Sequence, residues 1–223
     1  MAEKKYVRIG TKNLKFAQLD DDGLVVGEPL SLPGTTEVDI TIESENATIS
    51  ADDGPYMTLS SGISKVTAKI SNYFLTPEAK RMLLGTKYAM GMEVYANDTN
   101  PNHVAMMFET QLQSNEAHPL YMGLLNGTFK FPDSKNKTKG SGAPDPEADE
   151  IEGEFVLQER GSRKTAEVNG FTSDPDFDMD TFIAYVMPKS QDELDKAVSK
   201  YEEALNKATN TPSTSSTQPV ENN

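Results

Sequence analysis

Residues 36–43 read Thr-Glu-Val-Asp-Ile-Thr-Ile-Glu, and this stretch alternates strictly between polar and apolar side chains. Val38, Ile40 and Ile42 fall on one face, whereas the acidic and hydroxyl side chains fall on the other. A period of two is typical of a half-buried β-strand. Residues 64–74 alternate in the same way. We therefore expect two long strands at the centre of a β-rich fold.

The segment between these strands, residues 44–62, is predicted to be a long projecting hairpin loop. It contains the turn-forming run Ala51-Asp52-Asp53-Gly54-Pro55-Tyr56. Most hairpin loops have about 2–5 residues, and much longer ones are often functional. This segment is therefore a candidate functional loop.

The β pattern continues along the chain with one helical interruption. Thr76 suits a helix cap, Pro77 suits the first helical position and Gly85 suits a C-terminal stop, which together predict a short inserted helix. The dipeptide Asn126-Gly127 marks either a tight hairpin or a bulge. Further strands are expected at residues 104–112, 120–131, 150–158, 165–168 and 181–187.

The C-terminal part differs from the rest in pattern. Ser190 and Glu193 match a capping box. An apolar stripe at helical spacing follows, made of Leu194, Val198, Tyr201 and Leu205. We expect three parts: a β domain at 1–189, an amphipathic helix at 190–209 and a disordered tail at 210–223. The polar run 132–149 is predicted to be a surface loop.

The composition argues against several classes of function. The 223 residues include 21 Lys and Arg against 35 Asp and Glu, for a net charge of −14, and no cysteine. Nucleic-acid binders normally carry a basic surface, and anionic membranes attract basic segments. Without cysteine there are no disulfides, thiol nucleophiles or cysteine metal sites. No segment approaches the ~20 apolar residues of a membrane span. We expect a protein that stays in the cytoplasm unless it leaves as part of an assembly.

No recognisable catalytic motif is present. The chain lacks a P-loop, an H-E-x-x-H motif and a G-x-S-x-G motif. His103 and His118 stand in loop-like contexts. The acidic run Asp174–Asp180 suggests calcium, but the EF-hand pattern fails where Gly and Glu are required. We predict no enzyme activity, no catalytic or metal-binding residue and no cofactor.

Seven stretches, taken in their order along the chain, carry a resemblance to a known family. They are YVRIGTKNL (6–14), FAQLDDDG (16–23), EVDITI (37–42), ADDGPY (51–56), KVTAKI (65–70), YMGLLNGTFKFP (121–132) and IEGEF (151–155). In pattern and order, the chain resembles the major tail tube proteins of long-tailed, non-contractile phages (siphophages) of Gram-positive bacteria. The similarity covers residues 6–187.

This resemblance implies a mainly-β fold, a sandwich or barrel-like tail tube fold with one short inserted helix. In such proteins, hexameric rings stack into a tube around a tape-measure protein. The long strands of neighbouring copies join into a barrel that lines the channel, and a long loop of each ring docks on the next ring. The implied partners are further copies of the chain, the tape-measure protein, and the tail terminator and distal tail proteins. The tube conducts DNA into the host without binding it specifically. The implied location is the virion, after assembly in the host cytoplasm.

The resemblance and the strand pattern together predict two sets of functional residues. The channel lining is predicted to be Glu37, Asp39, Thr41, Glu43, Lys65, Lys69, Lys130, Glu150, Glu152 and Glu154. The stacking loop is predicted to be Ala51, Asp52, Asp53, Gly54, Pro55 and Tyr56. Six carboxylates outnumber three lysines in the lining, so its net charge is −3, which should repel DNA.

Two other interpretations stay open at this point. The first is a different virion or surface β-sandwich, such as a head-decoration protein or an adhesin domain. The second is a carbohydrate-active or calcium-dependent binding module that uses Asp174–Asp180.

Overall fold

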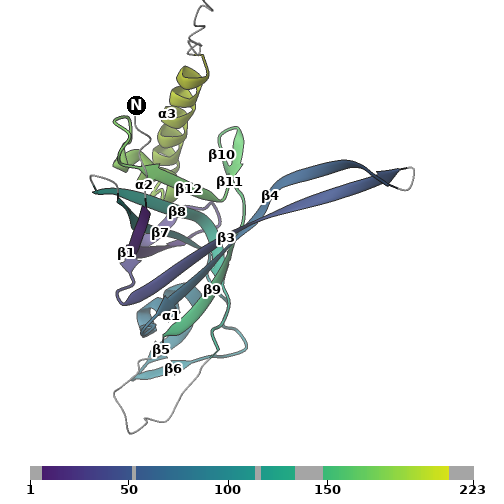
Figure 1. Cartoon of the computed structure of the whole chain (residues 1–223). Helices are drawn as coiled ribbons and strands as arrows, with labels where there is room; N and C mark the ends of the chain where they lie inside the picture. Colours follow the sequence, from purple (N-terminus) through teal and green to yellow (C-terminus); the bar gives the residue numbers. More distant parts are fainter. Residues whose placement is uncertain (1–6, 52–53, 114–116, 134–147, 211–223) are drawn as a thin grey trace, which may run out of the picture.

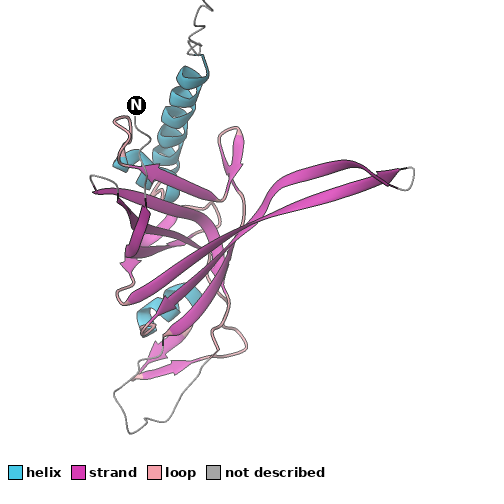
Figure 2. Cartoon of the chain, viewed as in Figure 1, coloured by secondary structure: helices cyan, strands magenta, loops and turns pink. Residues whose placement is uncertain are grey.

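The computed structural model describes residues 7–51, 54–113, 117–133 and 148–210. Eight strands form one large antiparallel sheet, which confirms the mainly-β prediction (Figures 1 and 2). Seven of them follow the order β2 (Val25–Ser31), β1 (Val7–Leu19), β7 (Val104–Gln113), β8 (Ala117–Phe129), β9 (Asp149–Phe155), β4 (Gly54–Asn72) and β3 (Thr35–Ala51). The eighth, β12 (Glu167–Phe171), pairs with β8.

Two short hairpins and three helices complete the described part of the chain. The hairpins are β5 (Lys87–Ala89) with β6 (Met92–Val94), and β10 (Gln158–Arg160) with β11 (Arg163–Thr165). The helices are α1 (Pro77–Leu84), α2 (Met179–Val186) and α3 (Gln191–Asn210).

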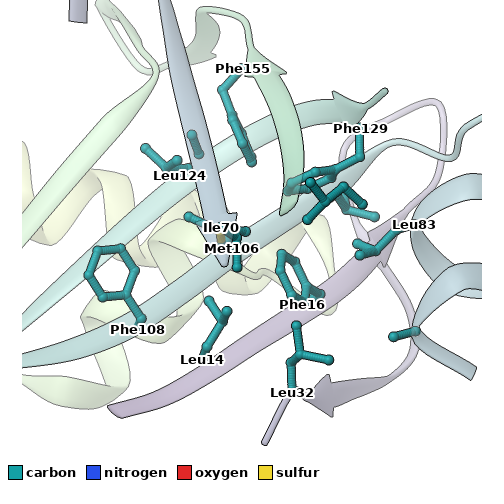
Figure 3. Packing of buried hydrophobic residues seen from close by; sticks show 14 of the residues in the cluster. Leu14, Phe16, Leu32, Ile70, Leu83, Met106, Phe108, Leu124, Phe129 and Phe155 are labelled. Carbon is teal, nitrogen blue, oxygen red and sulfur yellow. The ribbon is translucent and has the colours of Figure 1, made fainter. Parts of the chain in front are cut away.

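The main core lies on one side of the sheet, where β1, β4, β7, β8 and β9 meet and α1 packs against them (Figure 3). The Phe129 ring makes edge contacts with Phe16 and Phe155, at centroid distances of 5.5 and 5.9 Å. A second core on the other side of β1, β7 and β8 is covered by α2 and α3. Buried on both faces, β7 begins with the continuous apolar run Val104–Phe108.

The predicted inserted helix is present as α1. The Thr76 hydroxyl accepts a hydrogen bond from the Ala79 N–H at 3.2 Å, and Pro77 opens the helix. Gly85 ends it with a φ of +69°. A Cβ at Gly85 would lie 2.2 Å from the Asn100 carbonyl oxygen, so only glycine fits this stop.

The predicted C-terminal helix is also present, as α3. The Glu193 N–H donates to the Ser190 hydroxyl at 3.3 Å, and the Glu193 carboxylate accepts from the Lys189 N–H at 2.9 Å. Leu194 and Val198 of the predicted stripe are buried. Tyr201 is 44% exposed, and Leu205 is only partly buried. The first half of α3 therefore packs on the second core more closely than the last half.

Residues 181–187 were predicted as a strand, and this prediction is wrong: they lie in α2 and its C-terminal cap. Their β-branched and aromatic residues favour strands. In α2, however, Phe182, Tyr185 and Val186 are spaced to bury one side of a helix. Val186 packs over Gly123 of β8, where any Cβ would lie 2.5 Å from a Val186 methyl carbon. Packing against the sheet thus decides the helix.

The hairpin loop predicted at 44–62 is also corrected. Strand β3 continues to Ala51 and β4 begins at Gly54, so two paired strands form a hairpin arm that leaves the body (Figure 1). We define the arm as residues 44–64. Pro55 pairs with Ser50 within this ladder. The described turn-forming residues therefore lie only near the tip, and residues 44–50 before them are part of β3.

Bulges explain where the arm departs from the sheet. Glu43 pairs with Lys65 but Ser44 pairs with Ile63, so β4 holds one extra residue there. A further register shift follows at Gly62, whose φ is +78°. Bulges bend a strand and increase its local twist. Two successive bulges therefore place the bend at the base of the arm.

Three smaller differences concern element boundaries. Strand β8 runs continuously through Asn126-Gly127, and its pairing with β7 shifts by one residue there, so the dipeptide lies at a bulge and not in a hairpin. The strand predicted at 165–168 is divided between β11 and β12 at Ala166. Phe74, the last residue of the alternating stretch 64–74, is 63% exposed because β4 ends at Asn72.

Two predictions fall largely outside the described residues. The surface loop predicted at 132–149 includes residues 134–147, and the tail predicted at 210–223 includes residues 211–223. Both remain predictions.

Candidate functional site

The strand register brings the ten predicted lining residues to one face of the sheet. Across β3, β4 and β9, Asp39 stands opposite Lys69, which stands opposite Glu152. The Lys130 N–H donates to the Glu152 carbonyl at 2.8 Å and extends this row. Opposite residues of an antiparallel pair point to the same face. The remaining pairs are Glu43 with Lys65, Thr41 with Thr67, Thr67 with Glu154, and both Glu37 and Glu150 with Ser71.

We call these ten residues the acidic face: Glu37, Asp39, Thr41, Glu43, Lys65, Lys69, Lys130, Glu150, Glu152 and Glu154. Eight of them line a shallow depression of about 560 Å³; Glu37 and Glu150 lie one row beyond it. The row from Asp39 through Lys69 and Glu152 to Lys130 alternates acid and base, whereas the rows through Thr67 and Ser71 hold carboxylates beside hydroxyls.

Two lysines hold the carboxylates in place. The Lys130 ammonium lies 2.8 Å from a Glu152 oxygen and 2.7 Å from a Glu154 oxygen. The Lys65 ammonium lies 3.6 Å from oxygens of both Glu43 and Glu154. These contacts relieve the repulsion between like charges on neighbouring strands.

The same contacts shift the titration of the face. Hydrogen bonds from Lys130 lower the pKa of both Glu152 and Glu154. In return, hydrogen bonds to Glu152 and Glu154 raise the pKa of Lys130. All three groups are therefore charged at neutral pH.

The other side of these strands anchors the face to the core. Val66, Ala68 and Ile70 of β4 are fully buried, and Ile151 and Phe155 of β9 pack with them. Gly153 stands between Glu152 and Glu154 because the Phe129 ring covers it; a Cβ there would lie 2.8 Å from a ring carbon. The charged side chains therefore project from a rigid support.

The predicted stacking residues that the structure describes, Ala51, Gly54, Pro55 and Tyr56, lie at the tip of the arm. Ala51 pairs with Gly54, and Pro55 pairs with Ser50, whereas Asp52 and Asp53 lie outside the described residues. Figure 1 shows the tip far from the body. The structure thus places the two predicted sets in separate regions.

One set of exposed side chains was missed by the sequence analysis. Ile49, Met57 and Leu59 of the arm are 45–49% exposed. Ile49 stands opposite Met57, and Leu59 lies two residues further along β4, so all three share one face of the arm. Met57 and Leu59 are two residues apart, which is the spacing of one face of a strand. This pattern was not recognised because the segment was expected to be a loop.

In the acidic run Asp174–Asp180, which was considered as a calcium site, Asp178 joins the two C-terminal helices. The Asp178 carboxylate, at the N-terminus of α2, accepts hydrogen bonds from the Thr181 hydroxyl and from the Lys200 ammonium of α3. These bonds lower the pKa of Asp178 to about 2, with the largest effect from Lys200. Among the described residues, no group of three or more His, Asp or Glu is arranged to hold a metal ion.

Comparison with known proteins bears on the whole body of the chain. A family model for phage tail tube proteins matches residues 7–193, which include every described strand and the start of α3. No curated protein matches the chain. None of the helices in the described part is both long and apolar enough to cross a membrane. The match covers most of the sequence, so the chain belongs to the phage tail tube protein family and is a structural component of the virion.

Proposed function

We propose that six copies of the chain form a ring, that rings stack into a hollow tube, and that the acidic face lines its channel. The observation that carries this proposal is the acidic face itself: ten residues from four segments, ordered by register and supported from behind by the core. The tube surrounds the tape-measure protein during assembly and later conducts DNA.

The charge of the face suits passage rather than binding. Proteins bind DNA largely through cations that release counterions from the phosphates. The three lysines of the face are outnumbered by six carboxylates, and Lys65 and Lys130 are already engaged by them. Repulsion between the face and the phosphates acts over about 8 Å at physiological ionic strength. The channel wall should therefore not retain DNA by binding its phosphates.

Ring formation also resolves a problem of the isolated chain. Strand β3 is 17 residues long and lies at the end of the strand order, pairing only with β4 among the described residues. An exposed edge of this length invites uncontrolled pairing. A closed ring covers such an edge with the neighbouring copy.

The arm provides the contact between rings in this proposal, with residues 51–56 at its tip as stacking residues. The tail terminator and distal tail proteins complete the tube at its ends. Assembly takes place in the host cytoplasm, and the phage is a siphophage of a Gram-positive host. The resemblance described above supports these points.

Electron cryomicroscopy of the purified full chain tests the proposal. We expect hollow tubes of stacked six-fold rings, with the acidic face inside. Trimers or monomers in place of tubes would instead support a capsid-decoration role. Tubes with the acidic face outside would refute the lining assignment alone.

The stacking role of the arm has its own test. Replacing residues 44–62 with a short Gly/Ser turn should leave a folded, β-rich monomer or ring that does not polymerise. The body should survive because the ladder from Glu43–Lys65 onward, and all of its pairing with β9, is retained. Normal tubes from this variant would refute the role of the arm.

A further inference from the structure

A groove of about 780 Å³ opens beside the base of the arm. One wall is the base itself, through Ile42 and Ile63, and the other is formed by β12, α2 and α3. Much of its lining is apolar, including Ile42, Ile63, Leu157, Phe171, Phe177 and Tyr201. Ile42, Ile63, Phe171 and Tyr201 are each 44–50% exposed. Such a concentration of exposed apolar side chains typically marks an interaction site.

The groove is where the main core ends without a cover. Ile42 stands opposite Val66, which is fully buried and pairs with Phe155 at the end of β9. Beyond Val66, β9 no longer accompanies β4. The apolar side chains of β3 and β4 therefore continue beyond the end of β9, where they are no longer part of the buried core.

Strand β12 leaves hydrogen-bonding groups at the same place. Its residues line the groove, and among the described residues it pairs only with β8, so its second edge has no strand beside it. An extended occupant that pairs with this edge and also brings apolar groups would fit the groove.

The arm has the chemistry that the groove lacks. Ile49, Met57 and Leu59 present a half-exposed apolar face on an extended hairpin. Because the arm is an extended hairpin beyond the last residue of β4 that pairs with β9, its backbone also offers donors and acceptors to a free strand edge such as that of β12. The apolar match and the extended backbone both favour the arm as occupant.

We propose that the groove of one copy receives the apolar face of the arm of a second copy. The arm cannot serve its own groove, because it leads away from the body while its base forms one wall (Figure 1). The contact is therefore heterologous, with different surfaces on the two partners, which is the type that propagates into rings or stacks. This inference rests on the proposed tube and names the receptor for its arm.

Cysteine cross-linking tests the contact directly, because the chain has no cysteine of its own. Leu59→Cys in the arm and Phe171→Cys in the groove are made as single variants with tags of different size, mixed and oxidised during assembly. Both side chains are nearly half exposed, so both variants should fold. We expect a disulfide-linked heterodimer, which requires two different copies. The matched control mixes Leu59→Cys with Met90→Cys, on the distant β5–β6 hairpin, where Met90 is 93% exposed.

The outcomes separate this contact from the tube proposal. Tubes without the Leu59–Phe171 cross-link, or with Leu59 cross-linked to Met90 instead, would overturn the groove assignment and leave the tube intact. A Leu59–Phe171 cross-link in an assembly that is not a tube would support the groove contact and refute the tube. Absence of both tubes and cross-link would overturn both.

A second variant measures how much the contact between arm and groove contributes to assembly. Leu59→Asn should lower the yield of assembled protein at least about tenfold while leaving the melting temperature of the monomer unchanged, because Leu59 faces solvent in the isolated chain. Met92→Asn, at a 58% exposed methionine outside the arm, is the control and should assemble normally. Equal assembly of the two variants would contradict the proposal.

Discussion

Reversing two charges of the acidic face should convert the proposed channel from one that repels DNA into one that retains it. In the variant Glu152→Lys with Glu154→Lys, the face holds four carboxylates and five lysines, so its net charge changes from −3 to +1 per copy. Lys130 loses both of its carboxylate partners and becomes available to phosphates. Both altered side chains are partly exposed, so the sheet should still form.

The size of the effect follows from counterion release. If each new lysine meets one phosphate, a ring of six copies gains about twelve contacts, and a protein with about 6–10 such contacts loses about 10³–10⁵ in DNA affinity between 50 and 200 mM salt. DNA ejection from virions that carry the variant should therefore be at least about tenfold slower at 50 mM salt. It should return toward the unaltered rate at 200 mM.

The assay is receptor-triggered ejection, followed by dye fluorescence over a salt series, on particles whose tubes are intact by electron microscopy. A control variant, Glu159→Lys with Glu203→Lys, makes the same charge change at exposed positions outside the acidic face. Unchanged ejection at both salt concentrations, with intact tubes, would refute the reasoning. Equal slowing by the control would show that total charge, and not the face, matters.

Three further predictions concern the packing of the two C-terminal helices, and urea or thermal unfolding of the full chain tests each. Gly123→Ala should destabilise the fold by about 1–3 kcal/mol, because its methyl group would overlap Val186 of α2; no loss would mean that α2 does not press on β8. Leu194→Ala should cost about 2–5 kcal/mol, since this side chain of α3 is buried, and a surface-like value would mean that α3 is undocked. The pKa of Asp178 is lowered to about 2, mainly by Lys200, so the stabilisation of the fold by this ion pair is present above about pH 4 and is lost as the pH falls toward 2. The difference in unfolding free energy between the unaltered chain and Lys200→Met should therefore vanish over that pH range. A constant difference would contradict this.

The acidic face was predictable from sequence because strand periodicity sorts side chains by face without reference to any partner. Glu37, Asp39 and Glu43 alternate with apolar residues, and so do Glu150, Glu152 and Glu154. Which residues stand opposite one another depends on register, and register depends on partners far away in the chain. The two ion pairs of Lys130 show this, since they join segments 22–24 residues apart.

The groove and the apolar face of the arm could not be foreseen in the same way. Leu157, Phe171 and Tyr201 belong to different elements and have no common spacing in the sequence. They form one surface only because β12 pairs with β8, leaving its other edge beside the base of the arm. No local pattern encodes that arrangement.

By itself, the sequence determined the elements whose signals are local. Caps and stops specified α1 and the start of α3, and alternation specified the faces of β3, β4 and β9. Only the tertiary structure decided that residues 179–186 form a helix and that the segment before residue 51 stays paired. The physical reason is that strand propensity is a weak preference. Packing on a distant strand overrides it in α2, and pairing along the β3–β4 ladder extends the strands into a segment rich in turn-forming residues.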